Sequence, residues 1–294
     1  MIALAQPSLA NLPPEDSTLA QQVIQSPIVL TGRGGSGTRM LSLLANAADI
    51  FIGNEVNASG DSIEWADLLY KYSIKKLEND LLNQAYHDDE LHKELLGHAR
   101  YYLDQGNWDG IQPWGWKLPE TMFLIPQIAS VFKDSIFIHL VRHPISSSIR
   151  RTHKTSRKSS PIGLAALRSA YQFAGRDLDK IGSDDDYLRN ALTWQHQVAG
   201  ISIFARDHLP KHRYLEVRYE DLCNRPNETR QNFLKYLGLP PDTRVSDIET
   251  IDIDSTRCNA ESYSDYRAKE VWDLCSETAL QLGYNESGVA NDLV

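Results

Sequence analysis

The sequence has few cysteines, and its first residues lack the features of a targeting or membrane segment. Its three cysteines, Cys223, Cys258 and Cys275, lie far apart without CxxC spacing, which argues against a zinc cluster or a disulfide framework. Residues 1–17 contain no basic residue and three prolines, so they read neither as a secretory signal nor as a membrane span. We therefore expect a soluble protein of the reducing cytoplasm without stable membrane insertion.

An excess of positive charge is also absent. The 294 residues carry a formal net charge of -9, so a general nucleic-acid-binding surface is not expected. With 41% hydrophobic residues, a chain of this length can bury one large core. Residues 1–26 are polar and contain prolines, and we expect them to form an N-terminal arm before a single domain at residues 27–294.

Short apolar runs alternate with amphipathic stretches along the chain. The runs typical of strands are 28–31, 114–118, 136–141 and 214–217. Helical spacing of apolar residues is found at 38–48, over most of 62–102, and at 121–132, 145–155, 164–178, 186–208 and 227–237. This alternation predicts an α/β fold whose central, mainly parallel sheet is flanked by helices in three layers.

A glycine-rich segment, Gly32-Arg33-Gly34-Gly35-Ser36-Gly37-Thr38-Arg39, lies between the first predicted strand and helix. Backbone N–H groups and the helix dipole can surround a phosphate at such a position, although an ordinary flexible turn is the simpler alternative. Its spacing imitates the nucleotide-binding loop GxxxxGK[ST], but Thr38 replaces the lysine and Arg39 replaces the magnesium-binding Ser/Thr. A conventional kinase or ATPase site is therefore disfavoured.

Four segments in this order resemble sulfotransferases that use 3′-phosphoadenosine 5′-phosphosulfate (PAPS). The glycine loop is similar to their 5′-phosphosulfate loop, particularly in its Gly-Thr-Arg ending, which resembles the glycan sulfotransferase version. Trp116-Lys117-Leu118-Pro119 resembles the Lys-x-Pro segment, and residues 138–144 resemble the strand that leads into the 3′-phosphate motif. Residues 215–222 and 233–240 are similar to the Arg-Tyr-Glu-Asp-Leu and Leu-Gly-Leu-Pro blocks. The resemblance implies a P-loop-like fold and metal-independent transfer, with 3′-phosphoadenosine 5′-phosphate (PAP) as product.

The resemblance assigns donor contacts to two groups of residues. The 5′-phosphosulfate would be held by the loop, through Arg33, Gly34, Gly35, Ser36, Gly37, Thr38 and Arg39; Ser36 and Thr38 are alternatively simple helix caps. The 3′-phosphate would be held by Arg142, Ser146 and Arg150. Relatives commonly carry a serine where this chain has Arg150, and a lysine or arginine where it has Gly35. On a continuous helix Ser146 and Arg150 share a face, so we expect Arg150 to replace the hydroxyl contact.

Two residues are candidates for the chemical step. Lys117 follows a short apolar strand and is assigned to the bridging and leaving oxygens, with an exposed, solvated lysine as the alternative. Glu55 follows the first helix and a short expected strand, and it resembles the base of glycan sulfotransferases. Asp61 and Glu64 are nearby substitutes, and His143 and His153 are weaker candidates.

Sulfuryl transfer to a hydroxyl or amine is therefore the leading functional hypothesis. A P-loop small-molecule kinase is one alternative, and a catalytically inactive nucleotide-binding regulatory protein is another. The resemblance does not identify the acceptor, because acceptor pockets are built from variable loops on a shared donor scaffold.

Overall fold

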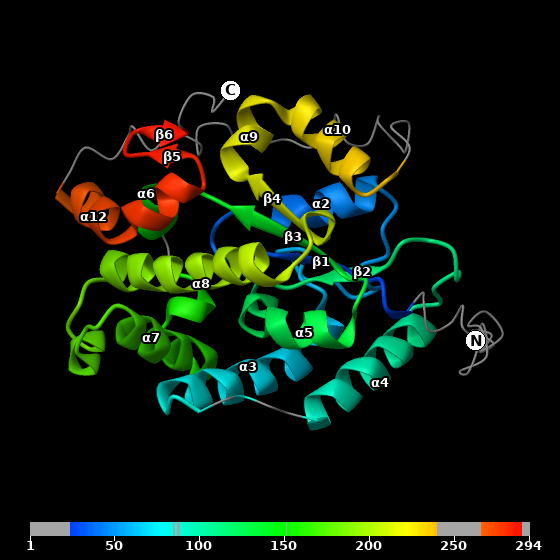
Figure 1. Ribbon diagram of the computed structural model, residues 1–294, viewed down its shortest axis with the longest axis horizontal. Coiled ribbons are helices and arrows are strands. Elements are labelled where there is room, and N and C mark those ends of the chain that lie inside the picture. Colours follow the sequence, from blue (N-terminus) through cyan, green and yellow to red (C-terminus); the bar gives the residue numbers. More distant parts are fainter. Residues whose placement is uncertain (1–23, 85, 87–88, 151, 240–265, 290–294) are drawn as a thin grey trace, which may run out of the picture.

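The computed structural model describes residues 24–84, 86, 89–150, 152–239 and 266–289. Most of the expected arm at residues 1–26 and the cysteine Cys258 lie outside these residues. The central sheet has four parallel strands in the order β2-β1-β3-β4, as expected (Figure 1). Their bounds are Ile28–Thr31 for β1, Gly115–Lys117 for β2, Ile136–Val141 for β3 and Tyr214–Arg218 for β4.

Helices cover both faces of this sheet. Successive side chains of each strand point to opposite faces, and both faces carry apolar side chains that the helices bury. On one face Leu30 and Leu140 pack against α2 (Arg39–Ala47), α9 (Tyr219–Asn224) and α10 (Pro226–Tyr236). On the other face Val29 and Phe137 pack into a second core. This core includes residues of α3 (Ala66–Leu81), α4 (Asp89–Gln105), α5 (Ile125–Val131) and α7 (Pro161–Phe173).

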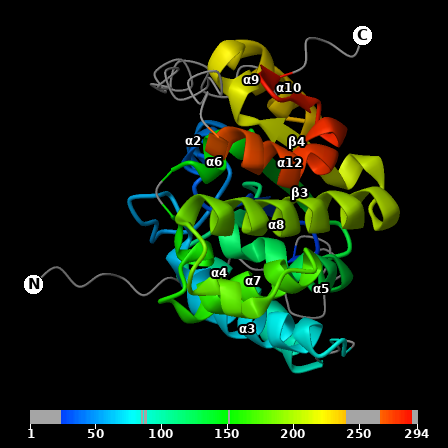
Figure 2. The same ribbon diagram turned by 90° about the vertical axis from the view of Figure 1, so that its left-hand side faces the viewer.

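The long helix α8 (Asp186–His208) runs past the end of the sheet, beside α7 and α12 (Tyr266–Gln281) (Figure 2). It also packs against α6 (Pro144–Ser148), the short helix that follows β3. The hairpin β5 (Tyr284–Asn285) and β6 (Gly288–Val289) closes this side of the molecule. The sequence pattern does not reveal α9, α12 or this hairpin, because all three are short or weakly periodic.

Three expectations about local structure are wrong. The expected helix at 145–155 ends at Ser148, because the Asn190 side chain donates hydrogen bonds to the carbonyls of Ser148 (2.9 Å) and Arg150 (3.4 Å). The short strand expected after the first helix is reduced to a single bridge between Phe51 and Trp114. Cys223 is disulfide-bonded, whereas Cys275 is a buried free thiol.

Short 3-10 helices lie in several of the connections between these elements. They cover Ile63–Trp65, Pro119–Leu124, Lys154–Ser156, Leu178–Ile181 and Lys211–Arg213. Among the described residues, no helix is both long enough and apolar enough to cross a membrane.

Candidate active site

The candidate site lies where the carboxyl ends of three parallel strands meet. The glycine loop follows β1, Lys117 is the last residue of β2, and Arg142 follows β3. Residue Leu30 of β1 is paired in register with Lys117, and Thr31 is paired with His139 of β3. In open α/β sheets ligands bind outside the carboxyl ends of the strands, so the sheet brings these segments to the expected edge.

The glycine loop leaves one hydroxyl buried and without a partner. The Ser36 side chain is 1% exposed, and its Oγ has no hydrogen-bond partner among the described residues. Thr38 precedes α2 but makes no capping hydrogen bond with its side chain. Neither side chain is therefore a helix cap, and both remain available to an anion at the first turn of α2. Arg39 is exposed beside them.

Gly37 makes this loop possible. It has a φ of +93°, a conformation that favours glycine, and a Cβ at this position would lie 2.4 Å from Cε2 of Tyr219. The loop therefore packs directly on the Tyr219 ring. The glycine of this motif has a steric role in addition to its conformational freedom.

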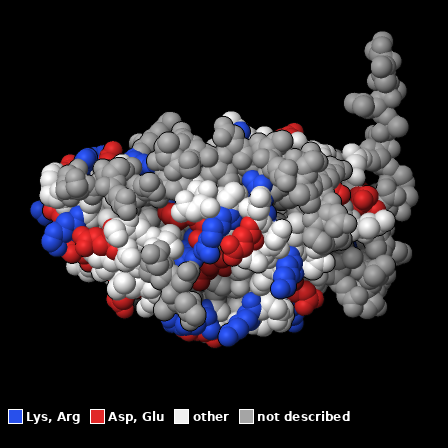
Figure 3. Space-filling model, turned by 90° about the horizontal axis from the view of Figure 1, so that it is seen from above, with Lys and Arg blue, Asp and Glu red and all other residues white. Residues whose placement is uncertain are grey.

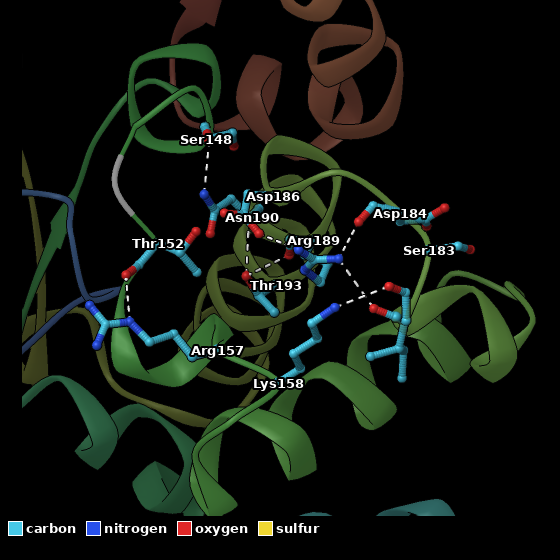
Figure 4. A network of polar contacts seen from close by, with 12 residues as sticks. Ser148, Thr152, Arg157, Lys158, Ser183, Asp184, Asp186, Arg189, Asn190 and Thr193 are labelled. Carbon is cyan, nitrogen blue, oxygen red and sulfur yellow. Dashed lines mark hydrogen bonds and ion pairs between the residues drawn. The ribbon is translucent and has the colours of Figure 1, made fainter.

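Arg33 lies inside the fold rather than in front of the loop. Its guanidinium donates to Ser156 Oγ (3.1 Å), Asn190 Oδ1 (3.1 Å) and Thr193 Oγ1 (3.3 Å). Further hydrogen bonds reach the carbonyls of Gly34 (3.1 Å) and Ser147 (3.5 Å). Burial lowers the pKa of Arg33 to about 10, and these neutral oxygens hold the loop to α8. Figure 4 shows the Asn190 and Thr193 end of this polar network.

A second cluster of partnerless hydroxyls follows β3. The side chains of Ser146, Ser147 and Ser148 are at most 2% exposed, and within the part of the chain that the structure describes none of their Oγ atoms has a hydrogen-bond partner. Arg142 is also 2% exposed, and its guanidinium carbon lies 4.3 Å from the centroid of the Tyr219 ring. Buried hydroxyls usually have partners, so three adjacent exceptions beside an arginine are suited to a bound anion.

Arg150 lies beyond the end of α6. The expectation that Arg150 and Ser146 share one helix face is therefore wrong, because the helix stops before Arg150. Arg150 instead lines an open cavity of about 480 Å³ together with Ser148, Arg267 and residues 184–187.

The acidic residue Glu220 has a structural place next to this cluster. One of its oxygens accepts the backbone N–H of His143 (3.0 Å), and the other accepts the Tyr284 hydroxyl (2.9 Å). The His143 ring stacks on Trp272, and burial lowers its pKa to about 4. Glu220 thus ties the turn after β3 to the C-terminal hairpin.

Lys117 is fully buried and ion-paired. Its Nζ lies 2.5 Å from Oδ1 of Asp61 and donates to the carbonyl of Ser59 at 3.0 Å. Burial lowers the pKa of Lys117, and the Asp61 charge opposes this shift. The other Asp61 oxygen accepts from Asn57 Nδ2 at 2.9 Å, so the carboxylate is fixed on both sides. The alternative of an exposed, solvated Lys117 does not hold.

Glu55 lies in the same loop but faces solvent. Its side chain is exposed, and its backbone N–H donates to Oε1 of Glu64 at 3.1 Å. The carboxylate that contacts Lys117 belongs to Asp61, which the sequence indicates only as a substitute for Glu55. The spacing of these residues offers no reason to prefer Asp61, because the turn at residues 57–61 decides which carboxylate points inward.

One further carboxyl group lies beside the ion pair. Glu120 follows Lys117 by three residues and is 2% exposed. Burial, and to a lesser extent the charge of Asp61, raise the pKa of Glu120 to about 7, while Lys154 and a hydrogen bond with Tyr70 oppose the shift. The Nζ of Lys154 lies 4.0 Å from the centroid of the Tyr70 ring. Sequence reasoning missed this group, whose only signal is its position just after Lys-x-Pro.

Charges of both signs are mixed on the surface of the molecule seen from above (Figure 3). Ion pairs join Asp221 of α9 to Arg218, the last residue of β4 (2.7 Å), and to Arg225, which lies between α9 and α10 (2.9 Å). Within the part of the chain that the structure describes, no group of three or more His, Cys, Asp or Glu side chains is placed to hold a metal ion.

Comparison with known proteins matches residues 27–243 to the sulfotransferase family. The fold is similar to that of sulfotransferase STF9 from Mycobacterium avium, with a TM-score of 0.51 and 12% identity over 89% of this chain and 78% of that one. The sulfotransferase domain from the curacin biosynthetic pathway matches with a TM-score of 0.46 and 17% identity, over 85% of this chain and 98% of that one. Among curated proteins no match is found.

Proposed function

Because the chain belongs to the sulfotransferase family, we propose that it moves a sulfuryl group from PAPS to a hydroxyl or amine acceptor. The observation that carries the choice of donor is that buried hydroxyls without a partner among the described residues lie at two places along one edge of the sheet. Ser36 lies in the loop after β1, and Ser146, Ser147 and Ser148 lie after the neighbouring β3. A donor with phosphate groups at two positions would satisfy both clusters.

In this proposal each cluster holds one end of the donor. The 5′-phosphosulfate end is bound by the loop at residues 34–39 and the first turn of α2, with Ser36 and Thr38 as side-chain ligands. Arg33 supports that loop from inside. The 3′-phosphate is bound by Arg142 and the α6 hydroxyls, with Arg150 at the rim of this site.

The chemical step is an in-line displacement at sulfur. The acceptor oxygen or nitrogen forms a bond to sulfur, the bond from sulfur to the bridging phosphate oxygen breaks, and PAP leaves with the electron pair. Lys117 is suited to stabilise the charge that develops on that bridging oxygen. Its position at the end of β2, beside the glycine loop, supports this role.

A carboxylate takes the acceptor proton, and we propose Asp61 for this role ahead of Glu55. Asp61 is held by Asn57 and already contacts Lys117. The proposed base and the residue proposed to stabilise the leaving oxygen are therefore in direct contact. Arrival of the donor would draw Lys117 toward the phosphosulfate and weaken its hold on Asp61. The freed carboxylate lone pair can then accept the proton.

The first test is calorimetric titration of the purified chain with PAP, compared with ATP and magnesium in a parallel titration. Selective binding of PAP supports the proposal and justifies an acceptor screen. Selective binding of ATP would favour the kinase, and binding of neither nucleotide would reject the donor site. Release of PAP from PAPS in the acceptor screen then separates an enzyme from an inactive nucleotide-binding protein.

A further inference from the structure

The imidazole of His153 lies directly on the glycine loop. A Cβ at Gly34 would be 1.9 Å from Nδ1 and 2.1 Å from Cε1 of this ring. A Cβ at Gly35 would lie 3.8 Å from the Cβ of His153 and 3.6 Å from Nη1 of Arg33. The position at which this chain lacks a basic loop residue therefore adjoins a histidine from a distant segment.

The hydrogen bonds of His153 define which ring nitrogen is available. Its Nδ1 accepts the backbone N–H of Thr155 at 3.3 Å and lies 3.1 Å from the Thr155 hydroxyl, so the ring caps the turn at Lys154–Ser156. A neutral imidazole that accepts at Nδ1 carries its proton on Nε2. His153 thus presents an N–H donor in addition to its capping nitrogen.

The charges around the ring favour an incoming anion. Burial, together with the smaller effects of the Arg33, Lys117 and Arg157 charges, lowers the pKa of His153 to about 4, and the charge of Asp61 opposes this shift. Three cations that disfavour protonation and one carboxylate that favours it therefore surround a ring that is neutral at pH 7. An anion bound at the loop would reverse this balance, because an opposite charge favours the protonated imidazole.

We propose that His153 is a ligand of the 5′ end of the donor, in place of the basic side chain missing at Gly35, and that it gains a proton at Nδ1 when the donor binds. This proton replaces the hydrogen bond that Nδ1 accepts from the Thr155 N–H in the free protein. This inference rests on the proposed function, because it requires an anionic nucleotide in the loop. It predicts that nucleotide binding is coupled to proton uptake by this one side chain.

Calorimetric titration with PAP from pH 6 to pH 8.5, repeated in buffers of different ionisation enthalpy, measures both affinity and proton uptake. The informative variant is His153→Asn, because an asparagine oxygen can replace Nδ1 as the cap of the Thr155 N–H but cannot titrate. His153→Gln is the second variant, in case the first does not fold. The exposed His212 on another turn supplies the control His212→Asn. Melting curves establish that each variant is folded.

We expect wild type and His212→Asn to take up a fraction of a proton that His153→Asn does not. Near pH 6.5 the affinity of His153→Asn for PAP should be about tenfold lower, and the difference should shrink as the pH rises. Protons taken up by the phosphates of PAP, or by His143 beside Arg142, are common to all variants and cancel when the variants are compared.

Equal affinity and equal proton uptake in wild type and His153→Asn would overturn the inference. A loss of PAP affinity in His153→Asn that is the same at every pH would also overturn it. Failure of wild type to bind PAP would instead reject the proposed function.

Discussion

The ring of Tyr219 lies under the guanidinium of Arg142, with the guanidinium carbon 4.3 Å from the ring centroid. The same ring packs against Gly37 of the glycine loop, where it leaves no room for a Cβ. One aromatic side chain from α9 therefore contacts both parts of the proposed donor site, the glycine loop and Arg142. Because Tyr219 is 6% exposed, it fixes their separation as part of the core.

Gly37→Ala should cost more free energy of PAP binding than free energy of unfolding. The methyl group would need the space of the Tyr219 ring, and the φ of +93° adds a cost of roughly 1–3 kcal/mol. The matched control is Gly175→Ala, where φ is +62° and no atom lies within 4 Å of the added Cβ. Chemical unfolding measures the stability of both variants, and PAP titration measures their affinity. Gly175→Ala reports the effect of backbone strain alone, so any further change in Gly37→Ala comes from displacement of the Tyr219 ring. Normal PAP affinity in Gly37→Ala would contradict the role of the Tyr219 contact.

Arg142→Ala should reduce the affinity for PAP by about 10- to 100-fold, because a charge-assisted hydrogen bond to a phosphate is lost. The exposed Arg206, which pairs with its neighbour Asp207, provides the control Arg206→Ala. Titration with adenosine 5′-phosphate adds a second comparison, because that nucleotide has no 3′-phosphate. Its affinity should differ little between wild type and Arg142→Ala. An equal loss for both nucleotides would place Arg142 elsewhere in the site.

Lys117→Ala should lower kcat by about 100-fold or more while changing the Kd for PAP much less, because the charge on the leaving oxygen develops only in the transition state. PAP release measures kcat once an acceptor is found. The exposed Lys269, paired with Asp273, gives the control Lys269→Ala. A kcat close to that of wild type would remove the proposed role of Lys117 on the leaving oxygen.

Asp61→Asn and Glu55→Gln form a direct comparison of the two candidate bases. We expect Asp61→Asn to lower kcat by about 10²- to 10⁴-fold, because an amide cannot accept the acceptor proton. Glu55→Gln changes an exposed side chain of the same loop and should have little effect. The reverse order of effects would assign the base to Glu55 and leave Asp61 as the partner that positions Lys117.

Glu120 should make stability depend on pH. Its pKa is raised to about 7 in the folded protein, so the folded state holds this proton more tightly than the unfolded chain, where the pKa is near 4.3. The stabilisation is complete below the unfolded pKa and is lost as the pH rises through about 7, with a loss on the order of 3 kcal/mol. Glu120→Gln mimics the protonated side chain and should lack this loss. Urea unfolding at pH 5 and pH 8 tests it, and parallel pH profiles of wild type and Glu120→Gln would refute the shift.

The sequence was most informative where local pattern and tertiary structure agree. The strand at residues 28–31, the glycine loop and the helix after it are adjacent in sequence, so their apolar spacing and glycines predict the motif directly. The four segments that resemble the family occur in the same order as in its members, and this order predicts the parallel sheet as well. The apolar spacing also predicts helix α8 at its observed bounds, since its long apolar face continues along the whole helix.

Contacts between distant segments were not predictable from these patterns. The helix after β3 ends because Asn190, about 40 residues away, binds the carbonyls of Ser148 and Arg150. Asp61 is turned toward Lys117 by Asn57, whereas Glu55 faces solvent, although both acids lie in one short polar loop. The interior position of Arg33 likewise depends on Ser156, Asn190 and Thr193, whose proximity arises only from the packing of α8.

The loop that carries Glu55 and Asp61 is attached to the sheet through Ser62. The Ser62 hydroxyl donates to the Ile52 carbonyl (2.6 Å) and accepts the N–H of Lys117 (3.0 Å), and residues 54–59 between these anchors are exposed. Substitutions at residues 54–56 can therefore accumulate without disturbing the glycine loop or Lys117, whereas Asn57 and Ser59 hold Asp61 and Lys117 in place. Under the proposed function, this exposed segment next to Asp61 can vary between related enzymes and change which acceptor is modified, while the glycine loop that would hold the nucleotide stays the same.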